Sequence, residues 1–254
     1  NLYLGAEHTL SKALSLTYGA RITVFRNVGK ALLYSYDQNY DVSGATEYGS
    51  GKIFHTYIRP EFRAGAVYKL DDYSSVKANF THNTQFIQMA NNSDSGSPLD
   101  LWFPASPNIK PQEANQYSVG YFRNFNNNSI ETSVEFYYKG MNNVIDFKDN
   151  AQILFNEKLE GEIRTGKGKS YGMEIMVKKN TGRLTGFVNY TLAHTDRTIP
   201  GINEGKTYLA PNDKTHSVNI LASYNLTKKW DVSAEWVFST GTPVTYPTGR
   251  FEIN

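Results

Sequence analysis

The stretch LSLTYGARITVFRN, residues 14–27, alternates between apolar and polar side chains. Its even-numbered residues from Leu14 to Val24 are apolar, whereas its odd-numbered residues from Ser15 to Thr23 are Ser, Thr, Gly or Arg. Successive side chains of a β-strand point to opposite faces, so this segment is predicted to be a strand with one apolar face and one polar face. In a soluble sandwich the apolar face would pack on a second sheet. In a membrane barrel it would contact lipid and leave Arg21 in a watery lumen.

Five short turn sequences each separate two such alternating segments. Asn, Asp, Gly and Ser adopt tight-turn dihedrals readily, so we predict a hairpin at each turn. The turns are SKA (11–13), DDYS (71–74), NNNS (126–129), KNTG (179–182) and LTKK (226–229). The connections from one hairpin to the next are long instead, at roughly 27–56, 88–115, 140–169 and 194–214.

This alternation of short and long connections distinguishes between the all-β architectures. Outer-membrane barrels have short turns on the periplasmic side and long loops on the outside. A propeller also repeats every ~40–50 residues, but its blades have four strands, whereas each repeat here holds two. We therefore predict an all-β protein, a transmembrane antiparallel up-and-down β-barrel with about ten strands in this chain. The alternatives are a soluble all-β binding domain and a small complete outer-membrane barrel that acts as an adhesin or surface protease.

Composition excludes several other classes of protein. No run approaches the ~18 apolar residues that a spanning helix needs. The net charge of +2, from 26 basic and 24 acidic residues, argues against a nucleic-acid partner. The chain has no cysteine, which excludes disulfides and thiolate metal sites. Aromatic residues make up 14% of the chain, which suits both β-strands and the aromatic girdles of membrane barrels.

Motifs for catalysis or metal binding are absent from the sequence. The five histidines lack metal-ligand spacing, and GKGKS (166–170) lacks the spacing of a phosphate loop. The segment NNSDSG (91–96) has no glutamate where a calcium loop would need one. We therefore expect no catalytic residue, no metal and no cofactor, and the protein is not predicted to be an enzyme.

Several segments resemble the later barrel strands of TonB-dependent outer-membrane receptors. They include IRPEFRAGAVYKLDDYSSVKANFTHNTQF, QYSVGYFRNFNNNSIETSVEFYYKGMNNVIDF, LEGEIRTGKGKSYGMEIMVKK, TGRLTGFVNYTLAHTDR and FSTGTPVTYPTGRFEI. The resemblance implies a 22-stranded barrel in the outer membrane, of which these strands form the C-terminal half less the last few. We expect residues 1–254 to be a single barrel segment that is truncated at both ends.

The same resemblance implies a function and a set of partners. The function is to bind a nutrient and import it with inner-membrane energy, and the ligand could be a glycan, a peptide, a metal chelate or a corrinoid. The implied partners are the lipid bilayer, a plug domain of the same chain, and the TonB energy-transducing complex, which would be reached through the missing N-terminal part. A surface lipoprotein is a further candidate partner.

Two regions are predicted to contact the ligand. Arg59 and Arg63 flank Glu61 on the lumen face of one predicted strand, either as ion pairs that brace the wall or the plug, or as a basic contact for an anionic ligand. The loop DLWFPASPNIKP carries Trp102 and Phe103, and GKTYLAPNDK carries Tyr208. Aromatic rings stack on sugars and flat ligands, although a loop can also pack on its own aromatics. The predicted ligand-binding residues are Trp102, Phe103, Tyr208, Arg59 and Arg63.

Overall fold

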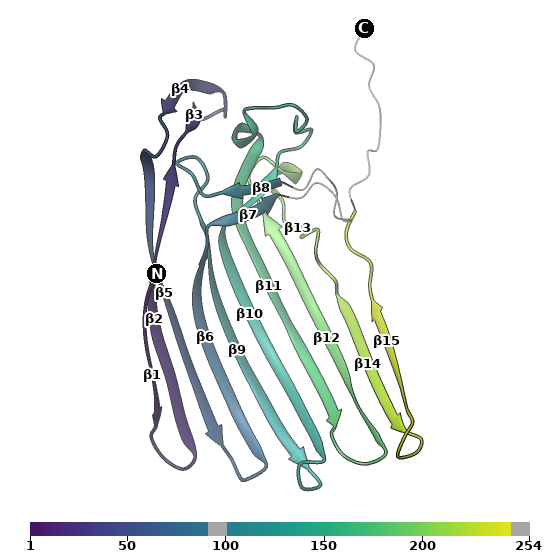
Figure 1. The fold of residues 1–254 in the computed structure, drawn as a ribbon. Coiled ribbons are helices and arrows are strands. Elements are labelled where there is room, and N and C mark those ends of the chain that lie inside the picture. Colours follow the sequence, from purple (N-terminus) through teal and green to yellow (C-terminus); the bar gives the residue numbers. More distant parts are fainter. Residues whose placement is uncertain (91–100, 245–254) are drawn as a thin grey trace.

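The computed structural model describes residues 1–90 and 101–244, and its main feature is one curved antiparallel sheet (Figure 1). Ten long strands follow one another in sequence order, and each pairs with the next. The strands are β1 (Leu2–Thr9), β2 (Leu14–Val28), β5 (Ile53–Lys69), β6 (Ser74–Gln85), β9 (Gln112–Phe125), β10 (Ile130–Phe147), β11 (Ile163–Lys179), β12 (Leu184–Thr198), β14 (His216–Asn225) and β15 (Asp231–Ser239). The all-β, up-and-down prediction is confirmed. Among the described residues β1 and β15 are edges that do not pair with each other, so these strands do not close into a ten-stranded barrel.

All five predicted hairpin turns are present, and they lie together at the lower end of the sheet in Figure 1. The long connections lie together at the opposite end, which we call the long-loop end. No helix within residues 1–90 and 101–244 has the length and apolar character needed to cross a membrane.

The long connections are shorter and more ordered than the sequence predicts. Strands such as β10, with 18 residues, continue well past the about ten residues that span a bilayer. Between the strands stand two hairpins, β3 (Ala31–Tyr36) with β4 (Val42–Tyr48) and β7 (Ile87–Ala90) with β8 (Leu101–Pro104). Two short 3₁₀ helices, Leu159–Glu162 and Asn203–Gly205, and the short strand β13 (Tyr208–Leu209) complete this end.

One face of the sheet is apolar and exposed. Ile22 and Val24 of β2 are 46% and 43% exposed on this face, and Arg21 lies on the other. The register continues the face from strand to strand. One row of paired residues on it runs Tyr18, Ala64, Phe80, Tyr117, Tyr138, Tyr171 and His194. A broad apolar face with an aromatic row is typical of a barrel wall in contact with lipid.

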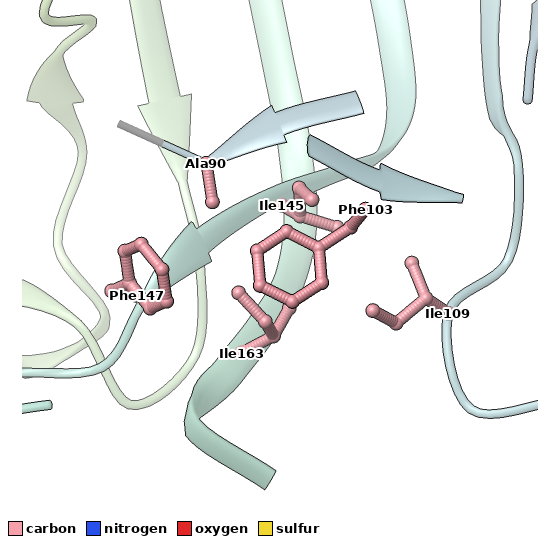
Figure 2. Packing of buried hydrophobic residues seen from close by; sticks show 6 residues of the cluster. All are labelled: Ala90, Phe103, Ile109, Ile145, Phe147 and Ile163. Atoms are coloured by element: carbon pink, nitrogen blue, oxygen red, sulfur yellow. The ribbon is translucent and has the colours of Figure 1, made fainter. Parts of the chain in front are cut away.

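The buried core lies among the long loops instead of between two sheets. Figure 2 shows its residues, which come from β7, β8, β10, β11 and the connection before β9. Four partly buried residues, Leu101, Ala151, Ile153 and Leu159, pack against them. The core residues are Ala90, Phe103, Ile109, Ile145, Phe147 and Ile163. The long-loop end is therefore a packed layer with its own hydrophobic centre.

Candidate functional site

Tyr208 is held at the rim of the sheet by a charged pair. It lies on β13, which pairs with the end of β12 and places it opposite Arg197. The Tyr208 hydroxyl donates to Asp146 Oδ2 at 2.9 Å, and Arg197 Nη1 donates to the same oxygen at 3.1 Å. Burial, followed by the negative charge of Asp146, raises the pKa of the Tyr208 phenol. The phenol therefore stays protonated at neutral pH, and its hydroxyl is committed to Asp146.

Trp102 and Phe103 are neighbours on β8, but they point in different directions. Phe103 is 6% exposed, and its ring packs edge-to-face on Phe147 with the centroids 5.9 Å apart. Trp102 is 64% exposed. Of this predicted pair, Trp102 is presented to solvent, whereas Phe103 belongs to the core under the loops.

Sequence reasoning missed an apolar surface on the connection between β10 and β11. Leu154 is exposed there and Phe155 is fully exposed. The backbone at Phe155 has a φ of 54°, which a bulky residue rarely adopts. A cavity of ≈ 550 Å³ is lined by Leu101, Ile153, Leu154, Phe155, Asn156, Glu157 and Leu159. The available signal was the apolar triplet ILF (153–155) inside an otherwise polar loop.

On the lumen face, Glu61 is the centre of a buried polar cluster. Its side chain is 5% exposed and accepts hydrogen bonds from Arg21 Nε at 2.7 Å and Arg21 Nη2 at 3.0 Å. The Thr23 hydroxyl donates to it at 2.8 Å and the Thr84 backbone N–H at 2.9 Å. Arg21 belongs to β2 and Thr84 to β6, so one carboxylate joins the strands on both sides of β5.

The Thr84 contact stands at a discontinuity in the sheet. Pairing between β5 and β6 ends at Phe62 opposite His82, although β6 continues to pair with β9 as far as Gln85. Above Phe62, β5 pairs with β2 alone among the described strands. Glu61 therefore stands at the start of a seam between β5 and β6, and its carboxylate takes the Thr84 N–H there.

The two predicted arginines next to Glu61 have different surroundings. Arg59 Nε lies 2.9 Å from Glu113 Oε1, and the Arg59 guanidinium lies 5.1 Å from the centroid of the Tyr57 ring. Arg63 covers the ring of Tyr3, 4.5 Å from its centroid, and contacts its hydroxyl. A cavity of ≈ 500 Å³ is lined by Tyr3, Gly19, Arg21, Glu61, Phe62, Arg63, Thr81, His82 and Asn83. The wall thus contains both ion pairs and a recess onto which Arg21 and Arg63 open.

The described residues contain no group of three or more His, Cys, Asp or Glu side chains that could hold a metal ion.

The structure places the predicted ligand-binding residues in two regions. Arg59 and Arg63 line the lumen wall, whereas Trp102, Phe103 and Tyr208 belong to the long-loop end.

Comparison with known proteins gives both a family and a fold. The sequence matches the family described as TonB dependent receptor-like, beta-barrel over residues 1–252. No curated protein sequence matches the chain.

Three solved structures illustrate the likeness in fold. The alcaligin outer membrane receptor FauA from Bordetella pertussis has a TM-score of 0.60 at 15% identity, over 94% of this chain and 36% of that one. The ferric-catecholate import receptor Fiu from Escherichia coli K12 has a TM-score of 0.58 at 18% identity, over 92% and 33%. The copper transporter OprC has a TM-score of 0.61 at 14% identity, over 93% and 33%. The chain therefore spans about a third of the length of these proteins.

Proposed function

Because the chain belongs to the TonB-dependent receptor β-barrel family, we propose that it is part of a receptor that binds a nutrient at its long-loop end and imports it with inner-membrane energy. Proteins of this family are outer-membrane proteins, and the exposed apolar face of the sheet suits contact with lipid. The alternative of a soluble binding domain lacks a second protein layer over that face among the described residues.

The observation that carries the proposal is the packed layer of loops with solvent-exposed apolar side chains at one end of the sheet. Ligand sites are mostly apolar concavities with a few polar groups that fix orientation. The cavity beside Leu154 and Phe155 has this character, and Trp102 is exposed on the neighbouring β8. We propose that these three residues contact the ligand first. Phe103 is buried, so contact between it and a ligand would require the loop core to open.

The lumen wall is proposed as the next contact. Arg21 and Arg63 open onto the recess beside Glu61, which suits an anionic group of either the ligand or a plug domain. The plug domain of the same chain, the TonB complex and a surface lipoprotein are proposed partners of the whole receptor.

A metal chelate is the first ligand class to test. Among the structures of similar fold, Fiu is described as a ferric-catecholate import receptor and OprC as a copper transporter. Glycans, peptides and corrinoids are the other classes.

The test is uptake by cells that carry or lack the full-length receptor, with ferric chelates, oligosaccharides, peptides and corrinoids supplied one at a time as the limiting nutrient. We expect loss of the receptor to abolish high-affinity uptake of one class, and dissipation of the inner-membrane proton gradient to do the same. The proposal would be contradicted if cells without the receptor still took up every ligand class at high affinity. It would also be contradicted if uptake through the receptor survived loss of the proton gradient.

Single substitutions can then test the proposed ligand contacts. Phe155→Ala and Trp102→Ala should each raise the ligand concentration that gives half-maximal uptake about tenfold. An aromatic side chain that becomes buried when the ligand binds contributes roughly that factor. Leu226→Ala is the control, because Leu226 is also an exposed apolar residue but lies in a short turn at the opposite end of the sheet.

A further inference from the structure

Three long connections meet around the side chain of Glu160, which lies in the connection between β10 and β11. Ser106, from the connection between β6 and β9, donates its hydroxyl to Glu160 Oε1 at 2.7 Å. Asn108, two residues later, donates its side-chain amide to Glu160 Oε2 at 2.5 Å. The same Asn108 amide also donates to the Tyr34 carbonyl of β3 at 2.9 Å. One carboxylate and one amide thus link all three connections.

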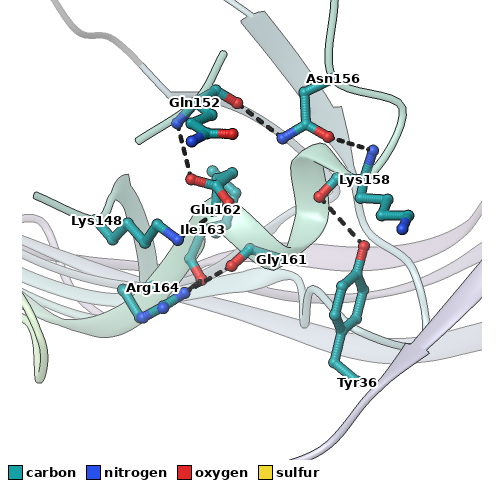
Figure 3. A network of polar contacts seen from close by, with 9 residues as sticks. All are labelled: Tyr36, Lys148, Gln152, Asn156, Lys158, Gly161, Glu162, Ile163 and Arg164. Carbon is teal, nitrogen blue, oxygen red and sulfur yellow. Dashed lines mark hydrogen bonds and ion pairs between the residues drawn. The ribbon is translucent and has the colours of Figure 1, made fainter. Parts of the chain in front are cut away.

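Further contacts join the β3–β4 hairpin to the connection that carries Glu160 and to the start of β11. The Tyr36 hydroxyl donates to the Lys158 carbonyl at 3.3 Å, as Figure 3 shows. A Cβ at Gly161 would stand 2.6 Å from Cε1 of the Tyr36 ring, so that the ring and the backbone are in close contact. The Arg164 guanidinium lies 3.6 Å from the centroid of the Tyr40 ring, at the turn of the hairpin.

The middle connection is fixed to the wall of the sheet. The Tyr57 hydroxyl of β5 donates to the Ser106 carbonyl at 2.7 Å, and Asn27 of β2 donates its amide to the Ala105 carbonyl at 2.8 Å. Ser106 is itself buried. Residues 105–108, which include both donors to Glu160, are therefore tied to the sheet, whereas the β3–β4 hairpin and the β10–β11 connection extend beyond it.

We propose that Glu160 is a positioning residue that holds these three connections as one unit, so that a ligand that contacts Leu154 and Phe155 also shifts the β3–β4 hairpin. Hydrogen bonds to a carboxylate are roughly twice as strong as those between neutral groups, which makes Glu160 the strongest link in the set. The consequence for ligand capture rests on the proposed function, but the coupling between the connections does not.

The test is backbone amide hydrogen exchange of the full-length receptor without ligand, with Glu160→Gln compared with the wild type. Glutamine keeps the size of the side chain but removes its charge and one acceptor. We expect about tenfold faster exchange in residues 31–48 and 156–162, and a smaller increase in residues 105–109, which Tyr57 and Asn27 continue to hold. Exchange in β9 and β10 below the rim should be unchanged. Faster exchange confined to residues 148–162, or none at all, would overturn the proposal, and neither outcome depends on which nutrient is imported.

Three further variants make the test specific. Glu157→Gln is the matched control, because Glu157 lies in the same connection and its carboxylate has no hydrogen bond to the described residues; it should leave residues 31–48 unchanged. Ser106→Ala removes one of the two bonds to Glu160 and should raise exchange in residues 31–48 and 156–162 by a smaller factor. Residues 105–109 are not compared in this variant, because Ser106 Oγ also accepts hydrogen bonds from the Asn108 and Ile109 N–H groups. If Asn108→Ala adds its full effect to that of Glu160→Gln in residues 31–48, the two residues act separately and the proposal fails.

Discussion

At the scale of single residues, two carboxylates beside the seam between β5 and β6 have contrasting surroundings. Glu61 is buried and accepts four hydrogen bonds, including one from a backbone N–H. Glu113 is about one-third exposed and pairs with Arg59, which is exposed to a similar degree. An exposed ion pair contributes little because water competes for both charges, whereas loss of a buried acceptor leaves its donors unpaired.

We therefore expect Glu61→Ala to lower the free energy of unfolding of the receptor by about 2 kcal/mol. Most of this loss comes from the Thr84 N–H and the Thr23 hydroxyl, because Arg21 is half exposed and can be hydrated. Glu113→Ala should cost less than about 1 kcal/mol. Urea unfolding of the receptor in lipid vesicles measures both, and equal losses would show that Glu61 is not the stronger link.

Some side-chain contacts at this scale could not be predicted from the sequence. Trp102 and Phe103 both read as aromatic residues of a loop, and their opposite orientations depend on contact with Phe147, more than forty positions along the chain. The alternation along residues 57–63 did place Arg59, Glu61 and Arg63 on one face. It could not show that Glu61 bonds Thr84, because that contact depends on where β5 and β6 separate.

At the scale of elements, the part of each strand that spans the membrane was predictable, but its upper end was not. Alternation marks a strand where its two faces meet different surroundings, which here are lipid and water. In β10 a bulge at Asn143, with a φ of 57°, interrupts the alternation, and the residues from Val144 to Phe147 are buried under the loops. Their sequence, VIDF, therefore does not alternate between apolar and polar residues, and it falls in the connection predicted over residues 140–169.

A second prediction concerns the start of β12. Gly186 has a φ of 148°, and a Cβ there would overlap the Leu221 carbonyl of the neighbouring β14. Gly186→Ala should therefore lower the free energy of unfolding by about 1–3 kcal/mol through backbone strain and displacement of β14. Gly44→Ala in β4 is the control, because no atom lies within 4 Å of its Cβ position. It should leave stability unchanged or raise it by up to about 1 kcal/mol. Similar losses in both variants, measured by urea unfolding, would contradict this account.

At the scale of the whole molecule, the two faces of the sheet have different solvents. Ile175 of β11 pairs with Val134 and Tyr190 on the apolar face. Its neighbour Met176 points to the other face, where it pairs with Ser133 and Asn189. Ile175 and Met176 are adjacent in the chain, so the main difference between them is the solvent that each side chain faces.

Ile175→Arg should therefore cost about 2–4 kcal/mol of folding free energy in lipid vesicles, because the charge would enter hydrocarbon. Met176→Arg should cost clearly less, since the lumen hydrates the guanidinium. Reversible folding into phosphatidylcholine vesicles, followed by tryptophan fluorescence, measures both. A larger loss for Met176→Arg would mean that the lipid-facing side has been assigned to the wrong face.

The seam above Phe62 and His82 has a mechanical consequence. A ladder of backbone hydrogen bonds resists separation cooperatively, whereas isolated side-chain contacts can break one after another. Above Phe62, a pull on β5 reaches β6 through the Glu61–Thr84 contact, β9 through the Arg59–Glu113 pair and the loop layer through the Tyr57–Ser106 bond, because β5 and β6 have no backbone pairing there among the described residues. Under load we therefore expect the upper part of β5 to separate from β6 along this seam before the backbone-paired part between Phe62 and Lys69 opens.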